Sequence, residues 1–183
     1  MQNRGMQSAA VDVRLNQRAE AEGWPMRCDG DLAFERGELA QLCKLWFERA
    51  KDGVPTRAAL DLRSLRPYAS HLTILERCGE GARRRYRFRL FGSSLALLFG
   101  EHTGRFLDEM VTPALLPNWL AFTDCVLEHE RPFRFINYYR LPTQDYLRGE
   151  IFAAPLADED GLVRMVLEAT YVGLKDAVPS PYG

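Results

Sequence analysis

The sequence has 183 residues, 46% of them hydrophobic, and a formal net charge of −1 from 24 basic and 25 acidic side chains. This length suits one domain with its own core, and the balanced charge argues against a dedicated nucleic-acid-binding protein, which usually carries a strongly basic domain. The four cysteines are scattered, so neither a zinc site nor a disulfide framework is predicted, and the densest apolar stretch, Leu95–Phe99, is too short for a membrane span. Together these features predict a cytoplasmic protein.

Residues 1–36 are polar and contain glycines without a sustained period, which predicts a flexible N-terminal tail; residues 174–183 are expected to form a C-terminal tail. The first strong element is a helix over 38–51. Its apolar residues recur on one face, namely Leu39, Leu42, Cys43, Trp46, Phe47 and Ala50. Such a stripe has to be buried, either against its own domain or in a homodimer through helix 38–51.

The next segments predict a hairpin. His71–Glu76 is rich in apolar and β-branched residues, Gly79–Gly81 is a turn signal, and Arg84–Leu90 alternates between arginines and apolar residues. A short helix over Leu95–Phe99 follows. Thr112 and Pro113 then open a longer helix, in the usual order of a cap residue before proline.

After Glu130 the period changes to two, which predicts strands over Pro132–Leu141, Tyr146–Leu156 and Val163–Val172, with turns at 142–145 and 157–161. In the last strand one face carries Val163, Met165, Leu167, Ala169 and Tyr171, and the other carries Arg164, Glu168 and Thr170. Grouped strands and grouped helices predict an α+β fold with an antiparallel sheet of about five strands, helices between strands two and three, and a preceding amphipathic helix.

This order resembles the PAS fold, and several motifs resemble a group of free-standing bacterial PAS proteins. The matching residues are Trp46 and Arg49, Gly53–Arg57, Tyr86–Gly92, Gly100–Leu107, Pro155–Leu156 and Gly161. The resemblance spans about 37–173, which is taken as a PAS-like domain. It implies a sensory or protein-interaction module that acts on a protein partner in trans.

The resemblance also implies a ligand site between the inner sheet face and the central helices. The residues that it places in the wall are Phe88, Leu90, Phe99, Trp119, Phe122, Phe135, Met165 and Leu167, with His102, Arg105 and Tyr138 as polar groups. The same residues also suit a filled apolar core, so a cavity and a packed interior both stay open. The cofactor, if there is one, is unknown.

The residues argue against two cofactors familiar in PAS proteins. Flavin-binding members carry a reactive cysteine where this chain has Gly104, so a flavin–cysteine adduct is not expected. Haem binding through one histidine is disfavoured, because His71, His102 and His129 are isolated and a single histidine carries little ligand specificity.

No phosphate-binding loop, dinucleotide fingerprint or nucleophile elbow is present, so no catalytic residue is assigned and the protein is not expected to be an enzyme. Two alternatives to a ligand-binding sensor remain. One is a pure interaction module with a filled core; the other is a small cone-shaped α+β isomerase, which an inward carboxylate from Glu150 or Glu168 beside a tyrosine would favour.

Arginines gather near one predicted strand, at Arg83, Arg84, Arg85, Arg87 and Arg89. A solvated sheet face with Glu76, Glu150 or Glu168 as cross-strand partners explains them, and a site for an anion or an acidic partner is the alternative.

Overall fold

The computed structural model describes residues 3–50, 53–140 and 146–174; the expected turn at 142–145 and most of the expected C-terminal tail lie outside the described residues. Its helices, including short 3₁₀ turns labelled η, and its strands are, in chain order, α1 (Asn3–Ala21), β1 (Met26–Asp29), α2 (Gly37–Arg49), η1 (Arg57–Ala59), α3 (Leu62–Leu65), η2 (Arg66–His71), β2 (Leu72–Cys78), η3 (Gly81–Arg83), β3 (Arg85–Phe91), α4 (Ser93–Phe99), α5 (Leu107–Met110), α6 (Leu116–His129), β4 (Phe133–Arg140), β5 (Tyr146–Ala157) and β6 (Val163–Leu174).

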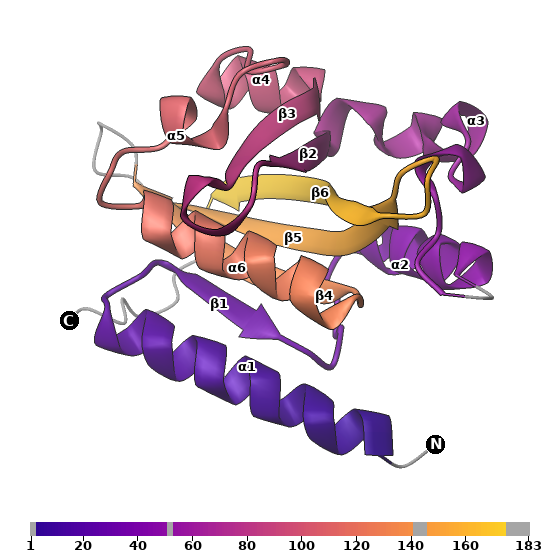
Figure 1. Ribbon diagram of the computed structural model, residues 1–183. Helices are drawn as coiled ribbons and strands as arrows, with labels where there is room; N and C mark the ends of the chain where they lie inside the picture. Colours follow the sequence, from indigo (N-terminus) through magenta and orange to yellow (C-terminus); the bar gives the residue numbers. More distant parts are fainter. Residues whose placement is uncertain (1–2, 51–52, 141–145, 175–183) are drawn as a thin grey trace.

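The strands form a six-stranded sheet in the order β1-β4-β5-β6-β2-β3, and every neighbouring pair is antiparallel (Figure 1). The predicted α+β fold is therefore confirmed, with the central helices between the β2–β3 hairpin and the last three strands. The expected number of about five strands was one too few, because β1 adds a strand at one edge of the sheet.

The prediction of a flexible tail over 1–36 is wrong for residues 3–29, which form α1 and β1. The apolar stripe of α1 is narrow, since it consists mainly of Val11, Leu15 and Ala19 at a spacing of four residues. A stripe this narrow is hard to distinguish from a polar segment in the sequence. Polar side chains supply much of the remaining attachment.

Those polar contacts lie along the free edge of β1. The side-chain amide of Asn16 donates to the Cys28 carbonyl at 2.8 Å, and its oxygen accepts from the Cys28 N–H at 2.7 Å. The Asp12 carboxylate accepts from the Gly30 N–H at 2.9 Å. Asn16 thus makes the pair of hydrogen bonds that a residue in a neighbouring strand would make.

The opposite edge of the sheet, at β3, is bonded by the loop that follows α4. The Phe88 N–H donates to the Arg105 carbonyl at 2.9 Å, and the Gly104 N–H donates to the Phe88 carbonyl at 2.7 Å. Gly104 has a φ of 83°, a conformation that favours glycine. Part of the β3 edge is therefore already occupied by the protein's own backbone.

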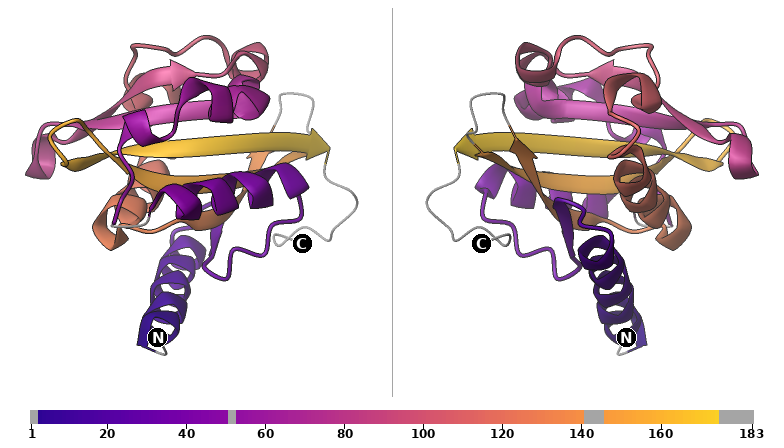
Figure 2. Two further views of the ribbon diagram at one scale, coloured as in Figure 1. Left: turned by 90° about the vertical axis from the view of Figure 1, so that its right-hand side faces the viewer. Right: turned by 90° about the vertical axis from the view of Figure 1, so that its left-hand side faces the viewer.

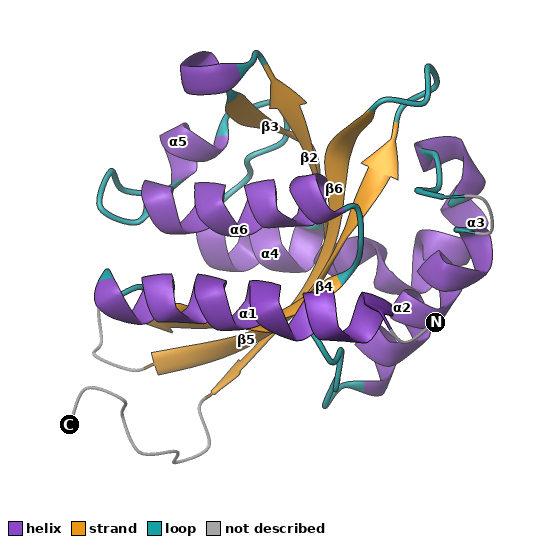
Figure 3. Cartoon of the chain, turned by 60° about the horizontal axis from the view of Figure 1, so that its bottom comes forward, coloured by secondary structure: helices purple, strands orange, loops and turns teal. Residues whose placement is uncertain are grey.

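Helices cover both faces of the sheet, which Figures 2 and 3 show from different sides. The face toward α1, α4, α5 and α6 is called the inner face, and the face toward α2, α3 and η2 the outer face. Each face has its own hydrophobic cluster, with Phe88, Phe122 and Phe135 in the inner one and Trp46, Met165 and Leu167 in the outer one. Both sides of the central strands are consequently buried.

Helix α2 packs on the outer face of its own sheet. Leu39, Leu42, Cys43 and Trp46 are buried there, and the Trp46 indole N–H donates to the Pro155 carbonyl at 3.0 Å. The apolar stripe expected to form a homodimer through helix 38–51 is therefore covered within the domain. Phe47, which is 51% exposed, is the large apolar side chain that this helix leaves to solvent in the described structure.

A buried carboxylate fixes the start of α2. Glu150 on β5 accepts from the backbone N–H groups of Glu35 and Arg36 at 2.8 and 3.0 Å, and from the Arg134 guanidinium at 2.6 Å. The carboxylate of Glu35 also receives hydrogen bonds from Arg134 and Arg148, which lower its pKa. Glu150 thus points to the outer face and has a structural role there.

The long helix α6 begins at Leu116, later than the expected start at Thr112. The Thr112 carbonyl accepts from the N–H groups of Leu115 and Leu116, each at 3.0 Å, so a separate turn precedes the helix. Pro117 then lies in the first helical turn, where its missing N–H costs no intrahelical hydrogen bond.

Candidate functional site

A small cavity lies on the inner face, between the sheet and the central helices. Its volume is about 30 Å³, which is room for one or two water molecules. The lining residues are Thr73, Leu75, Phe88, Phe91, Leu95, Phe99, Leu107, Met110, Trp119, Tyr139, Glu168 and Thr170. Most are buried, but Phe99, Met110, Trp119 and Tyr139 are partly exposed, so these four form the side of the cavity nearest to solvent.

A carboxyl group stands in the deep part of this cavity. Glu168 on β6 lies directly opposite Thr73 on β2, and the Thr73 hydroxyl donates to its carboxylate at 3.0 Å. Burial raises the pKa of Glu168 to about 7, and the hydrogen bond from Thr73 opposes that rise only in part. Near neutral pH the Glu168 carboxyl can therefore be either a neutral acid, which can donate a hydrogen bond, or an anion, which only accepts hydrogen bonds.

Further polar groups on the inner face lie near Glu168. Thr170 follows it on the same face of β6, and Tyr139 on β4 reaches the cavity across Gly149. A Cβ atom at Gly149 would lie 2.8 Å from the Tyr139 ring, so glycine is required for this close approach. Burial raises the pKa of Tyr139 to about 12, so its hydroxyl keeps its proton at neutral pH.

Three of the residues predicted for the site line the cavity, namely Phe88, Phe99 and Trp119. Phe122 and Phe135 belong to the same inner cluster, where their rings meet edge to face at 5.0 Å, but they do not line the cavity. The position of these five residues on the inner side of the sheet is as the resemblance implied.

The histidine expected as a polar group is buried beside the cavity. His102 packs on Phe88 and Phe91, with ring centroids 6.1 and 5.2 Å away. Its Nε2 is 2.9 Å from the Phe99 carbonyl oxygen. His102 therefore supports the aromatic wall from behind and does not reach the space itself.

Three predicted wall residues lie on the other side of the sheet. Leu90, Met165 and Leu167 pack in the outer cluster, so the prediction that they share a cavity with Phe88 is wrong. For Leu90 the cause is a bulge in the β2–β3 pairing: Ile74 pairs with Leu90 and Leu75 with Phe88, which leaves Arg89 unpaired. The extra residue turns Leu90 to the outer face.

From Met165 to Thr170 the two faces of β6 were separated correctly, but the wrong face was assigned to the cavity. At the start of the strand the separation fails, because Val163 packs on the inner cluster and Arg164 lines the outer groove. Met165 and Leu167 face α2 and its neighbours, whereas Glu168 and Thr170 face the central helices. Helices bury both faces of β6, so apolar residues alone do not identify the inner face. Here the more apolar face is the outer one.

The other two polar candidates are also outside the cavity. Arg105 is exposed and pairs with Glu109 at 3.5 Å. Tyr138 interacts with Arg148 on the outer face, while its neighbour Tyr139 faces inward. The sequence predicted Glu168 to be a solvated cross-strand partner of the arginines or, alternatively, the acid of an isomerase; Thr73, Thr170 and Tyr139 were not predicted as site residues.

Four of the five arginines near β3, namely Arg84, Arg85, Arg87 and Arg89, have carboxylate partners. Arg84 bonds to Asp124 of α6 at 2.6 Å, Arg85 to Asp108 at 3.0 Å, and Arg87 to Glu76 at 2.9 Å. The expected role of Glu76 as a cross-strand partner is confirmed. The expected alternatives Glu150 and Glu168 are not partners of this cluster, since they pair with Arg134 and Thr73.

The remaining histidines occupy separate places. His71 stacks on Tyr171 with ring centroids 4.0 Å apart, and His129 ends α6 near Phe133. Across the described residues, no group of three or more histidine, cysteine or acidic side chains is arranged to hold a metal ion. Within the same residues, no helix has the length and apolar character of a membrane span.

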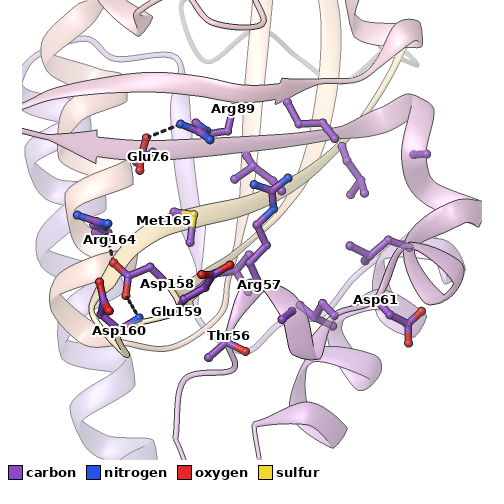
Figure 4. Close-up of a pocket in the computed structure, with 18 of the residues that line it drawn as sticks. Thr56, Arg57, Asp61, Glu76, Arg89, Asp158, Glu159, Asp160, Arg164 and Met165 are labelled. Carbon is purple, nitrogen blue, oxygen red and sulfur yellow. Dashed lines mark hydrogen bonds and ion pairs between the residues drawn. The ribbon is translucent and has the colours of Figure 1, made fainter.

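A second, larger hollow of about 840 Å³ opens on the outer face, beside the 56–69 segment (Figure 4). It is separated from the inner cavity by the sheet itself, since Leu72, Ile74 and Met165 line this groove while Thr73 and Glu168 line the cavity.

Solved structures similar to this chain are light-oxygen-voltage domains. A domain studied with a flavin analogue is 16% identical with a TM-score of 0.43, and the match covers 64% of this chain and 89% of that chain. An RNA-binding light-oxygen-voltage receptor is 13% identical with a TM-score of 0.39, covering 65% of this chain and 36% of that chain. The light-state domain of the blue-light photoreceptor aureochrome1 is 12% identical with a TM-score of 0.39, covering 62% and 89%.

No curated protein matches the chain. A sequence model of the PAS domain matches residues 35–169, which is most of the chain. The match includes β2 to β5, β6 as far as Ala169, and every residue of the inner cavity except Thr170. The order of the elements, the helices over the inner face and this match agree, and the chain belongs to the PAS domain family.

Proposed function

We propose that the protein is a signalling sensor that binds a small polar molecule in the inner cavity and acts on a protein partner in trans. The observation that carries this proposal is the Glu168 carboxyl, held by Thr73 on a mostly apolar wall. A buried ionisable group is costly, and a ligand that hydrogen-bonds to it would offset that cost.

In its present form the cavity admits only a ligand of a few atoms. Its volume of about 30 Å³ is far below the roughly 300–1,000 Å³ of sites that hold drug-sized molecules. Admission of anything larger requires the partly exposed side chains of Phe99, Met110 and Trp119 to move. Methionine and aromatic side chains at the rim can change rotamer without altering the sheet beneath.

Native mass spectrometry of the purified protein, compared with its denatured mass, tests the proposal. A bound small molecule is expected, and Thr170→Ile should lower its occupancy because the larger side chain narrows the cavity. Thr103→Ile, at an exposed turn, is the matched control and should leave occupancy unchanged. A protein without bound molecule, in which small polar fragments also shift no amide signals of Thr73 or Glu168, would refute ligand binding.

The small volume itself favours a second candidate, a protein-interaction module whose core is filled. In that case the partner binds without a ligand, and the protein is not an enzyme. Glu168 beside Tyr139 is the arrangement that the isomerase alternative required, but the cavity has no room for a substrate in this state.

We also propose a cytoplasmic location, which suits the unpaired cysteines Cys28, Cys43, Cys78 and Cys125.

A homodimer remains part of the proposal, with a changed interface. The stripe of α2 is buried in its own domain, so contacts through helix 38–51 would use its outward side, including Phe47. Phe47→Ser should then weaken a dimer seen by sedimentation without unfolding the chain.

A further inference from the structure

The outer groove is far larger than the inner cavity, and its floor is apolar. Leu72 and Ile74 of β2, Leu90 of β3 and Met165 of β6 form the floor, and Leu60 and Leu65 stand on the wall opposite. The volume of about 840 Å³ lies within the range of sites for drug-sized ligands. The groove can therefore hold a molecule with a substantial apolar body.

The acidic groups nearest the floor are already neutralised. Glu76 accepts from Arg87 at 2.9 Å and from Arg89 at 3.4 Å, so one carboxylate serves two arginines. Asp158 receives the Asp160 and Leu162 N–H groups at its Oδ1, both at 2.9 Å, while its Oδ2 lies 2.7 Å from Arg164.

Two arginine side chains at the groove lack carboxylate partners. Arg57 and Arg66 lie on the segment that forms the wall, and neither guanidinium makes an ion pair or a hydrogen bond with another described residue. Figure 4 shows Arg57 extending across the groove, away from the turn that carries Asp158, Glu159 and Asp160. Among the described residues that line the groove, four are arginines and five carry carboxylates, and the positive side is the one near β2 and β3, where Arg57 and Arg89 face the single carboxylate of Glu76.

We propose that this groove binds an amphipathic organic anion, with its carboxylate or similar head group on Arg57 and its apolar body on the floor of β2, β3 and β6. The floor excludes a wholly polar ligand, and the unpaired guanidinium favours a planar anionic head that can accept two hydrogen bonds. The exposed Glu159 and Asp160 at the other end disfavour a ligand with a second anionic group there. The site lies across the sheet from the inner cavity and does not depend on it.

Titration calorimetry with dodecanoate, below its micelle concentration, tests the inference. Dodecanoate is expected to bind one site, and dodecyltrimethylammonium, which has the same chain and the opposite charge, is expected to bind at least tenfold more weakly. Arg57→Gln should weaken dodecanoate binding about fivefold, the usual size of an exposed charge contact. Arg63→Gln is the matched control, because this exposed arginine of α3 does not line the groove.

A second variant tests the place of the apolar body. Ala58 is exposed and lines the groove, so Ala58→Trp should fill it and abolish binding without touching the core. Amide signals of Ile74 and Met165 should shift with dodecanoate, and those of Thr170 should not. The inference is overturned if dodecanoate does not bind, if both surfactants bind equally, or if the shifts gather at the inner cavity; the last result would leave the proposed function intact.

Discussion

Replacement of Glu168 by glutamine separates the charge of this buried group from its packing. Glutamine has nearly the same shape and keeps an oxygen that can accept from the Thr73 hydroxyl, but it cannot ionise. In the folded protein burial raises the pKa of Glu168 to about 7, whereas an unfolded chain would ionise it near 4.5. Between these values the folded state holds a proton that the unfolded state has lost.

The sign of the effect follows from this difference. The stability that Glu168 contributes is fully present below about pH 4.5, falls as the pH rises, and is lost by about pH 7. The whole displacement of the pKa corresponds to roughly 3 kcal/mol. The Glu168→Gln variant should therefore gain about 2–3 kcal/mol relative to the wild-type protein between pH 5 and pH 8.

Urea unfolding at several pH values measures this gain in stability. Any cost of burying the glutamine amide is the same at every pH, so it cancels when results at different pH values are compared. Glu80→Gln, at an exposed position, should show no such trend and serves as the control. A difference between Glu168→Gln and wild type that stays flat from pH 5 to 8, or that grows toward acid, would refute the assignment of a buried carboxyl with a raised pKa.

Three further substitutions test the fold around the site. Trp119→Ala should destabilise the protein by about 2–3 kcal/mol in a urea melt, below the ~3–5 kcal/mol of a fully buried aromatic, because Trp119 is partly exposed. Trp46→Phe removes the hydrogen bond to the Pro155 carbonyl and should cost about 1–3 kcal/mol; an unchanged melt would contradict the docking of α2 on its own sheet. Asn16→Ala should cost about 1–3 kcal/mol and speed hydrogen exchange at the Cys28 amide, and unaltered exchange there would contradict the pairing with α1.

The sequence predicts the order of the elements well wherever a strong period is present. The helix around Trp46, the hairpin and the last three strands were found because their apolar residues repeat at the spacing of one kind of element. The segment with Asn16 and Cys28 was missed because side-chain-to-backbone hydrogen bonds, which the period does not reveal, hold it in place.

The site was harder to predict because periodicity separates the faces of a strand without saying where each face points. In β6, Leu167 and Glu168 were assigned to opposite faces correctly, yet the cavity lies on the side of the carboxylate. A polar pair across two central strands, Glu168 with Thr73, was the available signal. The bulge at Arg89 left no trace in the alternating sequence, so Leu90 could not be placed without the pairing.

The partial occupation of both sheet edges limits how copies of this protein can associate. Unpaired strand edges are the usual starting point for sheets that continue from one molecule into the next, and for fibrous aggregates. Here the Asn16 side chain is hydrogen-bonded to the backbone of Cys28 at the β1 edge, and the backbone of Gly104 and Arg105 is hydrogen-bonded to that of Phe88 at the β3 edge. Assemblies of this chain should therefore form through helix surfaces and contain a limited number of copies. Loss of α1 would expose the β1 edge and should make the domain polymerise.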